Sequence, residues 1–206
     1  MPLFRFHRDE LLRQFRGVFR QFHGPLTLER GKRTNENFLK LIACIEQDAE
    51  WDNLRQIAYC VSTVYHEAGY DFEPREEYGK GFGKRYGAKV FLTRHQTVAY
   101  YGRGLVQITW LSGYSKASLL LGVDFVSHPE KVMEWPACYL IMADGMRRGW
   151  FTGKSLGDFL NATETDYVGA RRVINGQDRA ELIAQYAKEF ASLLTANLSE
   201  DDKDES

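Results

Sequence analysis

Apolar residues recur every three or four positions through most of this chain, and this spacing constrains its fold more than any other feature. The spacing places apolar side chains on one face of an α-helix. It is clear in residues 11–22, 38–45, 54–64 and 182–194. The glycine-rich residues 78–104 lack it and leave room for at most a small β-hairpin. The sequence therefore predicts a predominantly helical α+β protein.

Charge and length suggest how the chain is organised. Residues 1–33 form a basic amphipathic helical segment. Its basic side chains are Arg5, Arg8, Arg13, Arg16, Arg20, Arg30, Lys32 and Arg33, and its acidic side chains are Asp9, Glu10 and Glu29. Residues 34–198 form the rest of the core, and residues 199–206 have the composition of an acidic disordered tail. We expect one domain over residues 1–198. Its first helix either packs on the domain or lies on an anionic surface.

Residues that favour helix ends predict the boundaries of these helices. His23-Gly24-Pro25 should end the first helix, and Asn35 should cap the second. Asp52 is the expected cap of the third helix, which ends at His66 and Glu67. Further along, a helix over residues 114–121 should end at Gly122, and Pro136 should divide another into two pieces. Two further caps are expected at Ser127 with Glu130, and at Asp178 with Glu181.

Composition excludes several classes of function. The net charge of −1 gives the whole chain no bias towards nucleic acid. No apolar run approaches the ~20 residues that a membrane span needs. Three widely separated cysteines, Cys44, Cys60 and Cys138, do not have the spacing of a zinc site or a disulfide framework. The first residues lack the apolar core of a secretory signal, so we expect synthesis in the cytoplasm.

Three carboxylates lie close together around a break in the helical pattern. Glu67 ends the third apolar stretch, and Glu76 and Glu77 follow a Gly and a Pro. One carboxylate at a helix end and another on the next loop can face each other across a cleft, as glycosidic bond cleavage requires. The negative end of the helix dipole should raise the proton affinity of Glu67, which suits a general acid. The alternative is a solvated acidic loop.

Two further stretches have the features of a site. The glycine-rich residues 78–104 lack the ending of a phosphate-binding loop, so we interpret them as a wall or lid of the cleft. Residues 105–110 are apolar apart from Gln107 and Thr109. These two side chains either bond to the backbone or project together into a site, because positions i and i+2 share a face of an extended chain.

Three motifs together resemble the signature of glycoside hydrolase family 19, which contains chitinases and phage endolysins. They are His66-Glu67-Ala68-Gly69, the run from Tyr100 to Trp110, and the run from Ala170 to Gly176. The resemblance covers roughly residues 35–194, and residues 72–79 and 149–154 look most like the phage and prophage branch. It implies a two-lobed, lysozyme-like fold with a central substrate cleft. It also implies inverting hydrolysis of β-1,4 bonds between N-acetylated amino sugars.

The resemblance also assigns roles to residues. Glu67 matches the general acid, Glu77 the base with Glu76 as its rival, and Thr109 the hydroxyl that holds the attacking water. Inversion needs the two carboxyls ~6.5–9.5 Å apart. No cofactor or metal is expected, and a structural His66 is favoured over a metal ligand. The residues expected to bind substrate are His66, Tyr101, Gln107, Arg171 and Asn175.

The sequence departs from the family pattern at several positions. Gly69-Tyr70 stands where the family has Gly-Gly, and Ala68 stands where Thr or Ser is usual. Gly113 replaces the usual Asn before Tyr114, which puts details of water or substrate binding in doubt. None of these changes removes a carboxylate.

We therefore expect an endolysin that cuts the glycan strands of peptidoglycan. It would act as a monomer at the cell wall after another protein has permeabilised the membrane, with weak surface association through the basic N-terminal helix. One alternative is a chitinase that acts on N-acetylglucosamine polymers. The other is a non-catalytic wall-binding or virion protein that retains the fold.

Overall fold

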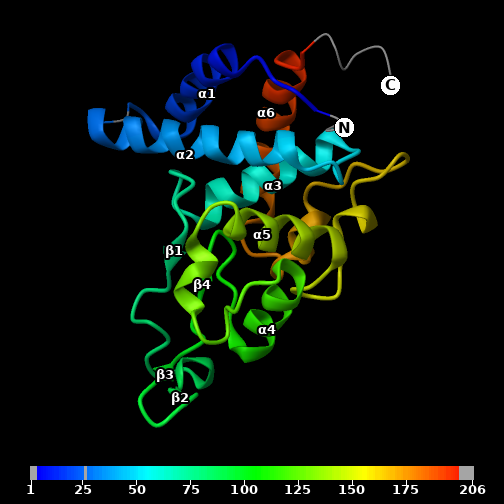
Figure 1. The fold of residues 1–206 in the computed structure, drawn as a ribbon. Helices are drawn as coiled ribbons and strands as arrows, with labels where there is room; N and C mark the ends of the chain where they lie inside the picture. The colour runs from blue at the N-terminus through cyan, green and yellow to red at the C-terminus, as the bar shows by residue number, and fades with distance from the viewer. Residues whose placement is uncertain (1–3, 26, 200–206) are drawn as a thin grey trace. The chain divides into compact units, whose positions relative to one another are not determined.

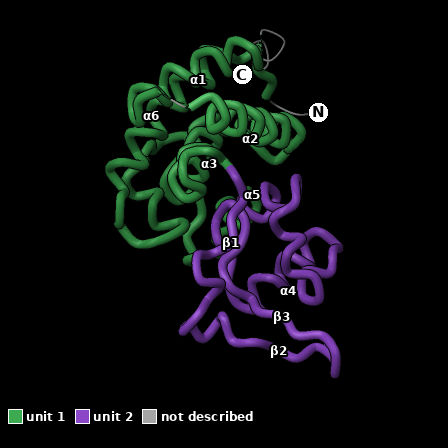
Figure 2. Tube along the Cα trace, turned by 90° about the vertical axis from the view of Figure 1, so that its left-hand side faces the viewer, with its two compact units in different colours: residues 1–72, 143–206 green, residues 73–142 purple. Residues whose placement is uncertain are grey.

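The computed structural model describes residues 4–25 and 27–199. The chain divides into two compact units, shown in Figure 2. Unit 1 comprises Met1–Phe72 and Ala143–Ser206, and unit 2 comprises Glu73–Met142. Helices predominate, and the strands are short antiparallel pairs (Figure 1). The predicted α+β class, mainly helical, is confirmed. The expected tail at residues 199–206 lies almost wholly outside the described residues.

Two helices open unit 1. The first, α1 (Arg8–His23), ends at Gly24 as predicted. The second, α2 (Leu28–Gln47), begins well before the predicted cap, so Asn35 lies inside the helix. The helix α2 runs through residues 33 and 34, where the sequence places the boundary between the basic segment and the rest of the core. Residues 29–33 are mostly charged good helix formers, and they extend the helix beyond the apolar pattern that was used to locate it.

The catalytic candidate Glu67 ends α3 (Leu54–Glu67). This helix is capped by Asn53 rather than by Asp52, because the Asn53 side chain accepts a hydrogen bond from the Arg55 N–H at 3.0 Å. It packs mainly against α6 (Ala180–Ala196). The expected cap of α6 by Asp178 and Glu181 is also wrong. Arg179 precedes that helix in a left-handed conformation, with no capping hydrogen bond from its side chain.

Aromatic side chains form the core of unit 1. Phe15 of α1 lies with its ring centroid 4.3 Å from that of Phe38, 5.7 Å from Phe72, 6.2 Å from Phe190 and 6.3 Å from Tyr65. Its side chain is fully buried. The apolar stripe of α1 therefore packs on the domain, the first of the two alternatives expected for this helix.

Unit 2 is built from short strands, turns and one complete helix. Strand β1 (Arg75–Glu76) pairs antiparallel with β4 (Arg103–Gly104), and β2 (Val90–Phe91) pairs with β3 (Thr97–Val98) as the small hairpin. The helix α4 (Trp110–Leu121) ends at Gly122 as predicted. Gly87, the last residue of η1 (Arg85–Gly87), touches Gly81 of the preceding loop so closely that a Cβ at Gly87 would lie 2.0 Å from the Gly81 oxygen.

The remaining elements are α5 (Ala137–Arg148) and the short 3₁₀-helices η2 (Pro129–Met133), η3 (Leu156–Asp158) and η4 (Gly169–Val173). Pro136 separates η2 from α5, as predicted. The capping box expected at Ser127 and Glu130 is wrong, since His128 precedes η2 and no side chain caps it. Among the described residues, no helix has the length and apolar character that crossing a membrane requires.

Candidate active site

Glu67 is held by an arginine that lies far away in the sequence. At the end of α3, its Oε1 accepts a hydrogen bond from Nη1 of Arg171 at 2.7 Å. The Arg171 side chain is 3% exposed, whereas that of Glu67 is 25% exposed. Glu67 therefore reaches solvent while its arginine partner stays inside unit 1.

Arg171 belongs to η4, within the third sequence motif. Its Nε donates to the carbonyl oxygen of Asp178 at 2.9 Å, and its own carbonyl accepts the N–H of Asn175 at 3.0 Å. Asn175 is exposed, and its Oδ1 accepts the Gly176 N–H at 2.8 Å. The first and third motifs thus meet in unit 1 around the Glu67 carboxylate.

His66 is half-buried next to Glu67. Its Nδ1 is buried and has no hydrogen-bond partner within the described ranges 4–25 and 27–199. Burial lowers the pKa of His66 below its ordinary value, mainly because the charged ring loses solvation. The bond to backbone or carboxylate expected for a structural His66 is therefore not found at Nδ1.

Glu77 is fixed in unit 2 through both carboxylate oxygens. The Tyr86 hydroxyl donates to Oε1 at 2.7 Å, and the Gly102 N–H donates to Oε2 at 3.1 Å. The Glu77 N–H in turn donates to the Gly102 carbonyl at 2.7 Å. A Cβ at Gly102 would lie 2.8 Å from Oε1 of Gln107 and 3.2 Å from Cβ of Glu77, so a larger residue there would displace the Gln107 side chain and crowd Glu77.

Glu76, which precedes Glu77 in the sequence, has more side-chain partners than Glu77. Oε1 accepts from the Tyr101 hydroxyl and from Nε of Arg103 at 3.2 Å, and Oε2 faces Nζ of Lys80 at 3.1 Å. The Tyr101 hydrogen bond is the main cause that lowers the pKa of Glu76, and Lys80 and Arg103 act in the same direction. Arg103 is itself buried, and it donates to the Tyr114 hydroxyl at 2.9 Å. Glu76 therefore ties the loop to a buried arginine.

Gln107 and Thr109 do not lie on one face of an extended strand. Gln107 has a φ of 54°, because Arg103 and Ile108 exchange backbone hydrogen bonds of 3.2 and 3.0 Å and close a tight turn. Its Nε2 donates to the carbonyls of Arg75 at 2.7 Å and Gly104 at 3.2 Å. Thr109 is half-buried and immediately precedes α4. Of the two alternatives for Gln107, backbone bonding is the one observed.

The structure thus gathers the candidates into two sets. Unit 1 holds His66, Glu67, Arg171 and Asn175, and unit 2 holds Glu76, Glu77, Tyr101, Gln107 and Thr109. Sequence reasoning missed the Glu67–Arg171 pairing and the role of Tyr86, for which no spacing gives a signal. Within the part of the chain that the structure describes, no group of three or more His, Cys, Asp or Glu side chains is placed to hold a metal ion.

Comparisons with known proteins place the fold. No family model matches the sequence, and no curated protein is similar enough to count as a match. Among solved structures, chitinase C from Streptomyces griseus HUT6037 aligns with a TM-score of 0.56 and 19% identity, over 87% of this chain and 76% of that one.

Two other solved structures align over similar lengths. A mutant of chitinase C has a TM-score of 0.50 and 17% identity, over 94% of this chain and 93% of that one. A bacterial family 19 chitinase has a TM-score of 0.49 and 17% identity, over 93% and 95%. The alignment with chitinase C from Streptomyces griseus HUT6037 shows that this helix-rich protein has the same fold.

Proposed function

We propose that this protein is a glycoside hydrolase that cleaves β-1,4 bonds in a polymer of N-acetylated amino sugars. The proposal rests on two carboxylates on a chitinase-like fold. Glu67 is partly exposed and is held by Arg171, and Glu77 is held by Tyr86 and Gly102. Chitinase C is named for chitin hydrolysis, and the three sequence motifs of this chain resemble those of family 19.

In the proposed reaction, Glu67 is the general acid and Glu77 the general base. Water held with the help of Thr109 attacks the anomeric carbon and gives its proton to Glu77, while the bond to the leaving oxygen breaks and that oxygen takes the proton of Glu67. The product therefore has the inverted anomeric configuration. Arg171 would stabilise the carboxylate that Glu67 becomes after it has given up its proton.

The hydrogen-bond partners of the two neighbouring acids favour Glu77 over Glu76 as the base. Each oxygen of Glu77 has one partner, so each can still accept a proton from water. Glu76 binds Tyr101, Arg103 and Lys80. We assign Glu76 the structural role of holding the loop in place.

Charge in unit 2 supports peptidoglycan as the substrate. Residues 78–123 contain no acidic residue, and six of their Lys and Arg side chains are exposed, which are Lys80, Lys84, Arg85, Lys89, Arg94 and Lys116. The aromatic side chains of Tyr78 and Phe82 in the same stretch are almost fully exposed. Chitin is uncharged, whereas peptidoglycan carries carboxylates on its peptides. A basic, aromatic surface that follows Glu77 therefore suits the charged polymer.

We accordingly propose an endolysin of the phage or prophage type, which acts as a monomer on the cell wall once the membrane has been opened. The direct test is to incubate the protein with purified Gram-negative peptidoglycan and with colloidal chitin, and to measure new reducing ends. The proposal predicts release from peptidoglycan at low salt, with a much lower rate on chitin.

Other outcomes of that test identify the alternatives. Release from chitin alone would establish the chitinase function. Binding to peptidoglycan with no reducing ends from either polymer would establish a non-catalytic wall-binding protein. Clearing of outer-membrane-permeabilised cells by the wild type should accompany peptidoglycan cleavage.

A further inference from the structure

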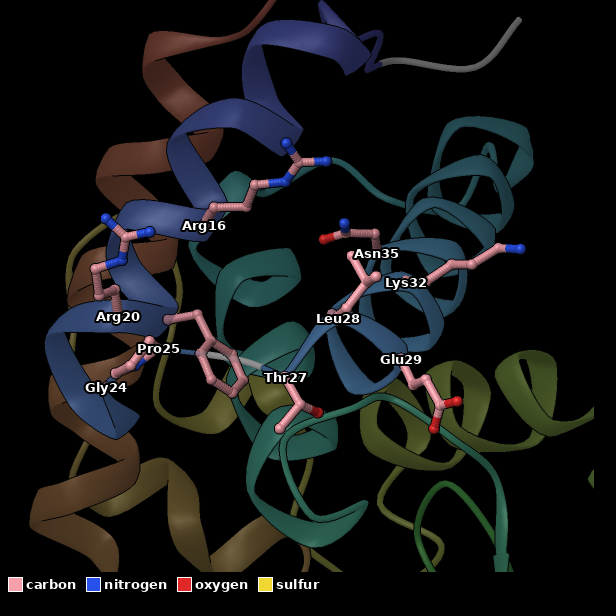
Figure 3. A pocket seen from close by; sticks show the side chains of 11 residues that line it. Arg16, Arg20, Gly24, Pro25, Thr27, Leu28, Glu29, Lys32 and Asn35 are labelled. Carbon is pink, nitrogen blue, oxygen red and sulfur yellow. The ribbon is translucent and has the colours of Figure 1, made fainter.

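A cavity of about 650 Å³ lies in unit 1 between α1 and the start of α2 (Figure 3). Arg16 and Arg20 project from α1, and Leu28, Lys32 and Asn35 belong to α2. None of these residues belongs to the candidate active site. The cavity volume is in the range of sites that hold small organic ligands or parts of larger ones.

The rim of this cavity is basic. Arg16, Arg20 and Lys32 are exposed, and in the described part of the chain none of them forms an ion pair or a hydrogen bond through its side chain. Among the described residues that line the cavity, Glu29 is the only acid. Three cations with no protein partner favour an anionic ligand.

One further feature adds to this preference. The cavity includes the first turn of α2, where the N–H groups of a helix lack intrahelical partners and attract anions.

The walls of the cavity are apolar. Phe19 lines it and is buried, and Pro25 and Leu28 lie near the opening. Leu28 is 91% exposed. A buried aromatic ring and an exposed aliphatic side chain beside basic residues match a molecule with a charged head and a hydrocarbon chain, rather than a free polyanion.

We propose that the α1–α2 cavity binds the head group and upper acyl chain of an acidic phospholipid at a membrane surface. Arg16, which extends from α1 towards α2 in Figure 3, would contact the phosphate, and Arg20 and Lys32 would add positive charge around the cavity. Phe19 and Leu28 would contact the chain. This site is separate from the carboxylates, so it holds whether or not the protein cleaves peptidoglycan. It gives the predicted surface association of the N-terminal region a defined location and ligand.

The test is co-sedimentation of the full chain with vesicles of phosphatidylcholine alone and of phosphatidylcholine mixed with phosphatidylglycerol. Each basic side chain near an acidic surface strengthens binding by roughly fivefold. The triple variant Arg16→Gln, Arg20→Gln, Lys32→Gln should therefore lose on the order of 100-fold in partitioning to the acidic vesicles. A matched variant with the same charge change elsewhere on unit 1, Lys40→Gln, Lys154→Gln, Lys188→Gln, should retain most of the binding.

The apolar contribution is tested in the same assay. Leu28→Ser should weaken binding severalfold, whereas Leu119→Ser, at another highly exposed leucine, should not. Equal binding to both kinds of vesicle, or equal losses in the two triple variants, would overturn the proposal. Displacement of the protein from vesicles by millimolar glycerol phosphate would also overturn it, in favour of a free phosphate ester.

Discussion

Single residues decide how the two candidate carboxylates are held. Glu67 and Arg171 are separated by 104 positions and meet because η4 brings the arginine to the end of α3. No spacing rule predicts such a contact, so the sequence placed Arg171 among the substrate-binding residues only by resemblance. From its burial and its bond to Glu67, we propose that Arg171 positions this carboxylate.

Substitution of Arg171 distinguishes a role in substrate binding from a role in positioning Glu67. A hydrogen bond to a charged group contributes about 1.5–3 kcal/mol, so Arg171→Gln should lower kcat on peptidoglycan by roughly 10- to 100-fold with little change in KM. Arg171→Lys should recover part of kcat. The exposed neighbour provides the control, since Arg172→Gln should leave both constants nearly unchanged. A rise in KM alone would assign Arg171 to substrate binding.

Glu76 makes the stability of the protein depend on pH. Its folded-state pKa is lowered from the ordinary value of 4.5, so its stabilising contribution is complete above that pH. The contribution is lost as the pH falls through the lowered value. In urea unfolding, Glu76→Gln should therefore be less stable than wild type at pH 7, and the difference should shrink below about pH 4.5. The exposed Glu134→Gln should show no such trend. A pH-independent difference would refute this account.

At the scale of elements, the apolar spacing located the helices better than it located their ends. The ends of α1, α3 and α4 agree with the sequence, because glycines or the loss of the apolar stripe mark them. The starts of α2 and α6 do not agree. No side chain caps α2 or α6, so cap residues in the sequence do not locate their starts. At the start of α3, two neighbouring polar residues could serve as the cap.

Substitutions at the start of α3 test which of the two residues caps this helix. Asn53→Ala removes the hydrogen bond to the Arg55 N–H and should cost about 1 kcal/mol in the free energy of unfolding. Asp52→Ala, one residue earlier, should change that free energy by only a few tenths of a kcal/mol. Chemical denaturation of both variants measures the difference. If Asp52→Ala proved the more destabilising, the sequence-based cap would be the correct one.

At the scale of the whole molecule, the sequence predicted the helix-rich class, because that class follows from spacing alone. It did not predict where the compact units divide. Unit 1 takes its residues from both ends of the chain, and only tertiary contacts reveal that the chain leaves it at Phe72 and returns at Ala143. The net charge of −1 is a sum over the whole chain, and the charges are distributed unevenly. Basic surfaces lie on α1–α2 and in residues 78–123.

Because α1 packs into the core of unit 1, loss of its buried aromatic ring should strongly destabilise the protein. Phe15→Ala removes a buried ring that contacts aromatic residues of three other parts of the unit. We expect a loss of about 3–5 kcal/mol in the free energy of unfolding, measured with urea. Phe91→Ala, at a ring that is 77% exposed, should cost little. A small effect of Phe15→Ala would mean that the N-terminal segment is an appendage.

The proposed function requires two carboxylates, Glu67 and Glu77, for cleavage of a glycan strand. This requirement is tested by the initial rate of reducing-end release from purified peptidoglycan by wild type and by Glu67→Gln, Glu77→Gln and Glu76→Gln, each with its folding checked by circular dichroism. We expect the first two variants to lose at least about 100-fold in rate, whereas Glu76→Gln should retain measurable turnover. Full activity in Glu67→Gln or Glu77→Gln would show that the proposed pair of carboxylates is wrong.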